Sequence, residues 1–190
     1  MLAALENNMK KIIASLLALF GFGAVAASES AAEKENVMFE LRQMVLNLKP
    51  EEIGLTKSNY SKEVFGLVFE TAYSNGAFSL VVLADGTVSL YFSGGGGIIG
   101  AGQHESVREA STNLLAGANQ FYPQAKKTTE FPIPEIEHCT LYFLTYKGVL
   151  RYSAKEIELG EGKDKLSELF HAAHYVISRL REAQEKNSNL

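Results

Sequence analysis

The first candidate for chemistry is a glycine-rich stretch, YFSGGGGIIGAGQHE, at residues 91–105. Its glycines match the G-x-G-x-x-G spacing of dinucleotide-binding loops, in which the backbone approaches a phosphate closely. The backbone amides of residues 97–102, ahead of a helix, could also hold an anion, with His104 as a base beside it. The candidate ligand-binding residues are Gly95, Gly96, Gly97, Gly100, Gly102 and His104.

The context of this stretch favours a structural explanation. In a dinucleotide-binding fold the strand begins a parallel βαβ unit, and an acidic residue follows about 20 residues later. Here the strand ends an antiparallel meander, and a proline-rich connection occupies residues 123–138. No lysine follows the glycines as it would in a P-loop. We therefore favour a tight corner from which Ile98 and Ile99 enter the core between helix and sheet; a ligand loop is the alternative.

The other side chains capable of chemistry form no complete catalytic set. His104 is the one candidate for a catalytic base, and no nucleophile is recognisable beside it. Glu168, His171 and His174 have a spacing found in carboxylate-bridged metal sites, but a helical wheel turns His171 away from the apolar stripe and leaves His174 at its margin. These histidines are candidates only for an exposed metal site, and no cofactor is expected. Cys139, the single cysteine, adjoins the apolar run TLYFLTY and is predicted to be a buried small hydrophobe.

Composition and charge restrict the classes of function. The chain has 190 residues, 46% of them hydrophobic and 21% charged, which suits one globular domain. Its formal net charge is −4, and lysine and arginine are scattered along the sequence without a basic stripe. A nucleic-acid partner is therefore not expected.

The first 26 residues have the order of a secretory signal peptide. Lys10 and Lys11 precede an apolar stretch at residues 12–22, and the small residues AVA follow at 24–26. The apolar stretch is shorter than the about 20 residues that cross a bilayer. We therefore expect a periplasmic or secreted protein. If residues 9–26 are not cleaved, the chain would be cytoplasmic, or anchored in the inner membrane through that segment alone.

Alternating apolar residues after position 64 predict a three-stranded antiparallel meander. Its strands, VFGLVFETAY, AFSLVVLA and TVSLYFS, are separated by Asn75-Gly76 and Asp85-Gly86, both strong hairpin signals. A two-residue loop at Asn75-Gly76 would pair Phe69 with Val82. A three-residue loop at 84–86, with Gly86 left-handed, places the apolar residues of all three strands on one face. The opposite face is half apolar, so we expect the first helix, or else a second subunit or partner, to cover it.

The remaining pattern completes one domain at residues 37–186, between a flexible leader at 27–36 and a frayed tail at 187–190. Apolar residues at helical spacing predict helices from residue 37 to just before Pro50, and near 103–122 and 164–183. Lys147-Gly148 joins a second hairpin. The order predicts an α+β fold, a single five-stranded antiparallel sheet with helices packed on it. This layout resembles the profilin-like, longin and roadblock domains, which implies binding more than catalysis.

Three phrases of the sequence resemble a family of uncharacterised bacterial proteins with no assigned activity: ADGTVSLYFSGGGGIIGAG, HESVREAS and LGEGKDKLSELFHAAHYVISRLR. The resemblance covers about residues 64–181. It implies a bacterial origin and the glycine loop and last helix as places for a shared ligand or partner, and it brings no catalytic residues. Members of that family usually have no export signal, so the N-terminal segment departs from it.

Two functions are compatible with these patterns. The first is an exported, non-enzymatic binding or assembly module that dimerises or holds a protein partner through the second sheet face or the glycine-loop edge. The alternative is a small-molecule or anion-binding protein that uses the glycine loop, with His104 as the base if it is hydrolytic.

Overall fold

A computed structural model of the chain describes residues 31–188, with the side chains of residues 39–186. The predicted signal peptide at residues 1–26, residues 27–30 of the predicted leader and the last two residues of the predicted tail lie outside the described residues. None of the helices between residues 31 and 188 is both long enough and apolar enough to cross a membrane.

The centre of the molecule is one antiparallel sheet of seven strands in the order β4-β3-β2-β1-β6-β7-β5. The strands are β1 (Val64–Tyr73), β2 (Gly76–Leu83), β3 (Val88–Phe92), β4 (Gly97–Ile98), β5 (Lys126–Thr128), β6 (His138–Thr145) and β7 (Gly148–Lys155). The predicted meander and second hairpin are both present, and they meet where β1 pairs with β6.

The prediction of five strands is wrong, because β4 and β5 add one strand at each edge. Two or three residues are too few to show an alternating pattern, and their composition, glycine in β4 and two lysines in β5, is not typical of strands. Both form by pairing with a longer neighbour, β4 with β3 and β5 with β7. The α+β class and the open antiparallel sheet are as predicted.

The register of the meander agrees with the predicted faces but differs at the first turn. Thr87 accepts a hydrogen bond from the amide of Leu83 (2.9 Å), and Gly86 has φ 93°, so the three-residue loop is confirmed. At the first turn Tyr73 pairs with Gly76, and Phe69 therefore lies opposite Leu80, not Val82. A shift of two residues keeps every side chain on its predicted face, because side chains alternate with a period of two.

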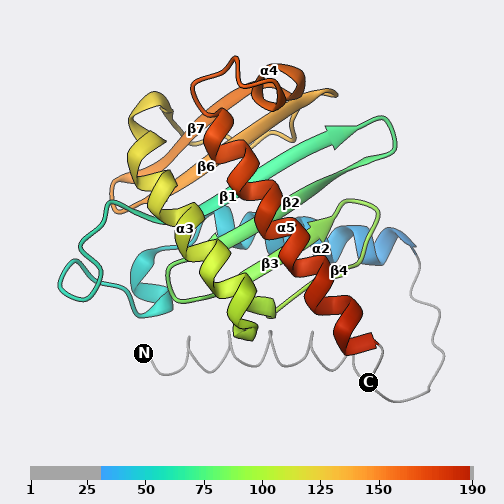
Figure 1. Ribbon diagram of the computed structural model, residues 1–190, viewed down its shortest axis with the longest axis horizontal. Helices are drawn as coiled ribbons and strands as arrows, with labels where there is room; N and C mark the ends of the chain where they lie inside the picture. Colours follow the sequence, from blue (N-terminus) through green and yellow to red (C-terminus); the bar gives the residue numbers. More distant parts are fainter. Residues whose placement is uncertain (1–30, 189–190) are drawn as a thin grey trace.

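Helices cover both faces of the sheet (Figure 1). Helices α3 (Glu105–Phe121) and α5 (Ser167–Ser188) cross one face, where the larger core cluster includes Phe69, Leu114 and Val176. Helix α2 (Ala31–Leu46) lies on the opposite face. Short helices connect the larger elements: η1 (Pro50–Ile53), η2 (Ala101–Gln103), η3 (Tyr122–Gln124) and α4 (Glu156–Gly160).

Helix α2 covers the half-apolar second face of the sheet, as the first of the two predicted alternatives required. The cluster on this side joins α2 and the following loop to the sheet; its buried members are Leu41, Val45, Leu46, Leu55, Phe65, Val68, Val81, Leu83, Tyr91, Tyr142 and Leu144. The helix also begins earlier than predicted, since residues 31–36, assigned to the leader, are helical. Alanine, glutamate and lysine in that segment are strong helix formers.

A buried ion pair ties α2 to the central strand. Arg42 donates two hydrogen bonds to the carboxylate of Glu70 on β1, from Nε (2.6 Å) and from Nη2 (2.8 Å). Ser79 of β2 donates a third to the same carboxylate (2.6 Å), and Nη2 of Arg42 also reaches the carbonyl of Pro132. The Arg42 and Glu70 side chains are only 6% and 2% exposed. The second face is therefore covered by α2 and the loop after it, from within the chain.

Candidate functional site

The glycine run forms a hairpin turn that returns the chain to the sheet. Gly95 and Gly96 have φ values of 89° and 84°, a conformation that favours glycine. The amide of Gly95 donates to the carbonyl of Phe92 (3.0 Å), and the amide of Phe92 donates to the carbonyl of Gly96 (3.2 Å). Gly97, the first residue of β4, then pairs with Tyr91 of β3. These contacts support the corner interpretation, with the addition that the corner includes a short strand.

Two further glycines allow close approach of backbone segments. A Cβ at Gly97 would lie 2.3 Å from the carbonyl oxygen of Leu90, and a Cβ at Gly102 would lie 1.8 Å from that of Gly86. Ile98 enters the core on the α3 and α5 side as expected. Ile99 instead packs against the α2-side cluster, because adjacent residues of an extended segment point to opposite faces.

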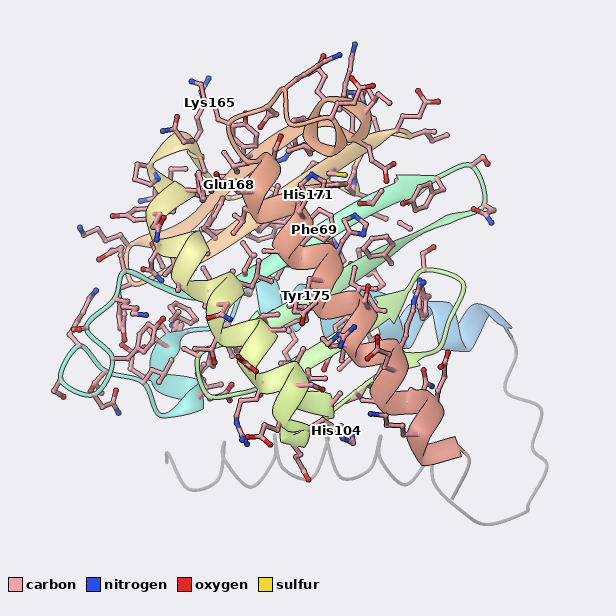
Figure 2. All side chains as sticks on the ribbon, viewed as in Figure 1. Phe69, His104, Lys165, Glu168, His171 and Tyr175 are labelled. Carbon is pink, nitrogen blue, oxygen red and sulfur yellow. The ribbon has the colours of Figure 1, made fainter. Side chains whose placement is uncertain are left out.

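His104 lies at the start of α3, beside an open groove of about 440 Å³ (Figure 2). The groove runs between the first turn of α3 and the last turns of α5, and it is lined by His104, Glu105, Ser106, Glu109, Glu182, Ala183 and Lys186. The lining contains three carboxylates and one lysine. The carboxylates lie near the positive end of the α3 dipole and partly neutralise it. Glu182 is paired with Arg179, and none of the glycines predicted to hold an anion lines the groove.

The two histidines of α5 have different environments. His171 is exposed, whereas His174 is half-buried and its ring packs against Phe69, Phe78 and Phe170, with centroids 5.4, 6.3 and 4.4 Å away. Nε2 of His174 is buried and has no hydrogen-bond partner. Among residues 39–186 no three histidine, cysteine, aspartate or glutamate side chains are grouped to hold a metal ion. His171 and His174 are thus divided between solvent and core.

Cys139 is buried, as predicted, in the core cluster on the sheet face that α3 and α5 cover. Its thiol lies 3.1 Å from the hydroxyl of Thr71, the residue opposite it on β1. Burial raises the pKa of the Cys139 thiol to about 12. A thiol that is protonated and shielded from solvent is a poor nucleophile.

An aromatic cluster lies at the end of the sheet beside α5, with Tyr73 and Phe92 exposed and Phe78 half-buried between the core and solvent. Phe78 lies directly opposite Phe92 in the register, and its ring centroid is 6.3 Å from that of Tyr73. Tyr73 is 41% exposed and Phe92 is 36% exposed. Tyr73 donates a hydrogen bond to Glu156 of α4 (3.0 Å), and burial together with this bond raises its pKa to about 12. We call these three residues the aromatic face.

Sequence reasoning missed the aromatic face, although it placed Phe78 and Phe92 on the correct side of the sheet. The alternating pattern identifies residues that point toward the helices, but it does not tell how far the helices extend. The signal that could have found it is the length of β1 and β2, whose hairpin continues past the last residues paired with β6.

Comparisons of the chain with models of protein families, with curated proteins and with solved structures find no match. The resemblance to a family of uncharacterised bacterial proteins therefore stays a prediction, and the candidate site is interpreted from its own geometry.

Proposed function

We propose that this chain is an exported, non-enzymatic binding module that holds a protein partner against the aromatic face. Export rests on the signal-peptide pattern of residues 1–26. The observation that carries the binding role is the group of large aromatic side chains left exposed at one end of the sheet. The partner is a protein segment that presents apolar side chains to Tyr73, Phe78 and Phe92.

The aromatic face has the composition of an interface centre. Aromatic residues are enriched where proteins bind one another, because each buries a large area with few rotatable bonds. Ile157 of α4, 63% exposed, is a further exposed apolar side chain, in the helix whose Glu156 accepts the hydrogen bond of Tyr73. A contiguous exposed apolar patch of this kind marks interaction sites more often than single exposed residues do.

The first test uses a random peptide library selected on the immobilised chain, with affinities measured by calorimetry. Peptides rich in apolar residues should bind, and Phe92→Ser should weaken them by about tenfold or more, the usual effect of removing a large central contact. Phe39→Ser is the matched control, since Phe39 is 49% exposed on α2 and lies outside the aromatic face. Equal binding to both variants, or no binder at all, would overturn the proposal.

The groove beside His104 supports part of the alternative function, a small-molecule site that includes His104, although no glycine of the loop lines the groove. Its open volume and polar lining suit a small polar ligand. A thermal-shift screen of amines and anions tests this alternative. A ligand that raises the melting temperature of the wild-type chain and not of His104→Ala would support it, and the absence of any shift would exclude it.

A further inference from the structure

His174 joins α5 to the aromatic face. Its ring lies 6.3 Å from that of Phe78, a member of the face, and it also contacts Phe69 and Phe170 in the core beneath. The contacts are edge-on or tilted, and Nε2 is enclosed without a hydrogen-bond partner. Protonation of the ring would place a positive charge among three phenylalanine rings, with no acceptor at Nε2.

The charged groups around His174 come from two helices. Glu156 of α4 favours a positive charge on the ring, whereas Arg181 and His171 of α5 oppose it. The strand side chains that contact the ring are apolar: Phe69 of β1 and Phe78 of β2. Burial is the largest influence, and it lowers the pKa of His174 below its usual value.

We propose that His174 is a pH-responsive contact: protonation of its ring loosens α5 from the β1–β2 hairpin and exposes more of the apolar surface next to Phe78. Its role in partner binding rests on the proposed function, while the conformational change does not. The signal is the proton that His174 takes up. Mildly acidic pH therefore enlarges the aromatic face.

The direction of the effect follows from proton linkage. The opened state, with His174 in water, binds a proton near the ordinary histidine pKa of about 6.5, and the closed state binds it only at lower pH. The closed state is therefore fully stabilised above about pH 7 and loses stability as the pH falls through about 6.5. Between about pH 7.5 and about pH 5.5, the population of the opened state should rise by up to about tenfold.

Cys139 provides a reporter for this opening within the natural sequence. It is the single cysteine, it is buried, and it lies opposite Thr71 of β1, which in turn lies opposite Phe78 of β2. Cys139, Thr71 and Phe78 thus form one row across three strands. Because the thiol lies in the cluster between the sheet and the helices, reagents reach it when that layer opens.

The experiment measures labelling of Cys139 by dithiodipyridine in the full chain, with EDTA present, as a function of pH. Rates are divided by those of the chemically unfolded chain at the same pH, which removes the intrinsic reactivity of the thiol. Between about pH 7.5 and about pH 5.5 the normalised rate should rise by up to about tenfold in the wild type. The same rise is expected in His171→Gln, because that histidine is exposed on the same helix.

His174→Phe and His174→Gln should both abolish the rise, since neither side chain titrates in this range. Two variants are used because one could repack poorly; a flat profile in either folded variant supports the proposal. A rise that persists in both variants, or a wild-type rate that does not change or falls at acid pH, would overturn it. Peptide binding to the aromatic face is measured at the higher pH, so failure of the pH response and failure of the proposed function are separate results.

Discussion

At the scale of single residues, the contact between Arg42 and Glu70 has the largest energetic consequence. The two charges are withdrawn from water together, and the cost of desolvation is offset by the two hydrogen bonds between them and a third from Ser79 to the same carboxylate. Such a pair adds little net stability compared with apolar residues of the same size, but removal of one partner leaves a buried charge alone. Its role is therefore to fix how α2 lies on the sheet.

Arg42→Met should lower the free energy of unfolding by about 3–5 kcal/mol, because Glu70 then stays buried without its counter-charge. The double variant Arg42→Met with Glu70→Gln should lose less than Arg42→Met alone, since the amide is neutral and can still accept the hydrogen bond from Ser79. Urea unfolding followed by circular dichroism measures all three chains.

The control for these variants is Lys163→Met, which removes an exposed ion pair with Glu161. It should cost about 1 kcal/mol or less. If Arg42→Met lowered the free energy of unfolding no more than Lys163→Met does, the Arg42–Glu70 pair would have to be exposed to water.

At the scale of elements, the glycine run shows how a motif-like pattern arises from backbone packing. Gly102 brings η2 against the β2–β3 loop, so close that a Cβ there would overlap the carbonyl of Gly86. Gly94, in the same run, has open space around it and no positive φ. Close packing therefore requires glycine at position 102, whereas nothing around position 94 requires it.

Gly102→Ala should lower the free energy of unfolding by about 1–3 kcal/mol, because the backbone of η2 or of the β2–β3 loop must move. Gly94→Ala should be neutral or stabilising by up to about 1 kcal/mol, through the lower entropy of the unfolded chain. Thermal unfolding of both variants provides the measurement. Equal stability of the two variants would be inconsistent with the packing at Gly102.

Long elements could be predicted from the sequence because their periodicity extends over many residues. This holds for β1, β2, β3, β6 and β7, for α3 and α5, and for the loop at Gly86. The shortest elements could not, because β4, β5 and α4 depend on neighbours that the local sequence does not specify. The start of α2 was missed since a polar, alanine-rich segment is compatible with either helix or leader.

The candidate site was less predictable than the fold. His104 and the glycines were found because they follow a known spacing, yet Gly97 and Gly102 are explained by close packing. The orientation of His171 away from the core was predicted from the helical wheel. The aromatic contacts of His174 were not, because they depend on where α5 crosses β1 and β2.

At the scale of the whole molecule, the sheet is enclosed between α3 and α5 on one face and α2 on the other (Figure 1). The two clusters are separate, and the second depends on α2 and the loop after it for its outer layer. Without that layer, Val68, Val81 and Tyr142 would be exposed together on the sheet.

A chain that begins at residue 49 should therefore associate and bind the hydrophobic dye ANS, whereas one that begins at residue 27 should not. Apolar surface of this extent is seldom left exposed by soluble monomers. Light scattering and dye fluorescence on the two purified chains test the expectation. A chain from residue 49 that melts cooperatively at the temperature of the longer chain would contradict it.

The ends of the sheet have a consequence for how the protein assembles. The strand order terminates in β4, with two residues, and β5, with three, of which Lys126 and Lys127 are exposed. Short and charged edge strands offer few free backbone groups to an incoming strand, and natural proteins use them against fibre formation. Polymerisation by pairing of edge strands between copies is thus disfavoured. Complexes of this protein should be of limited size and governed by side-chain contacts.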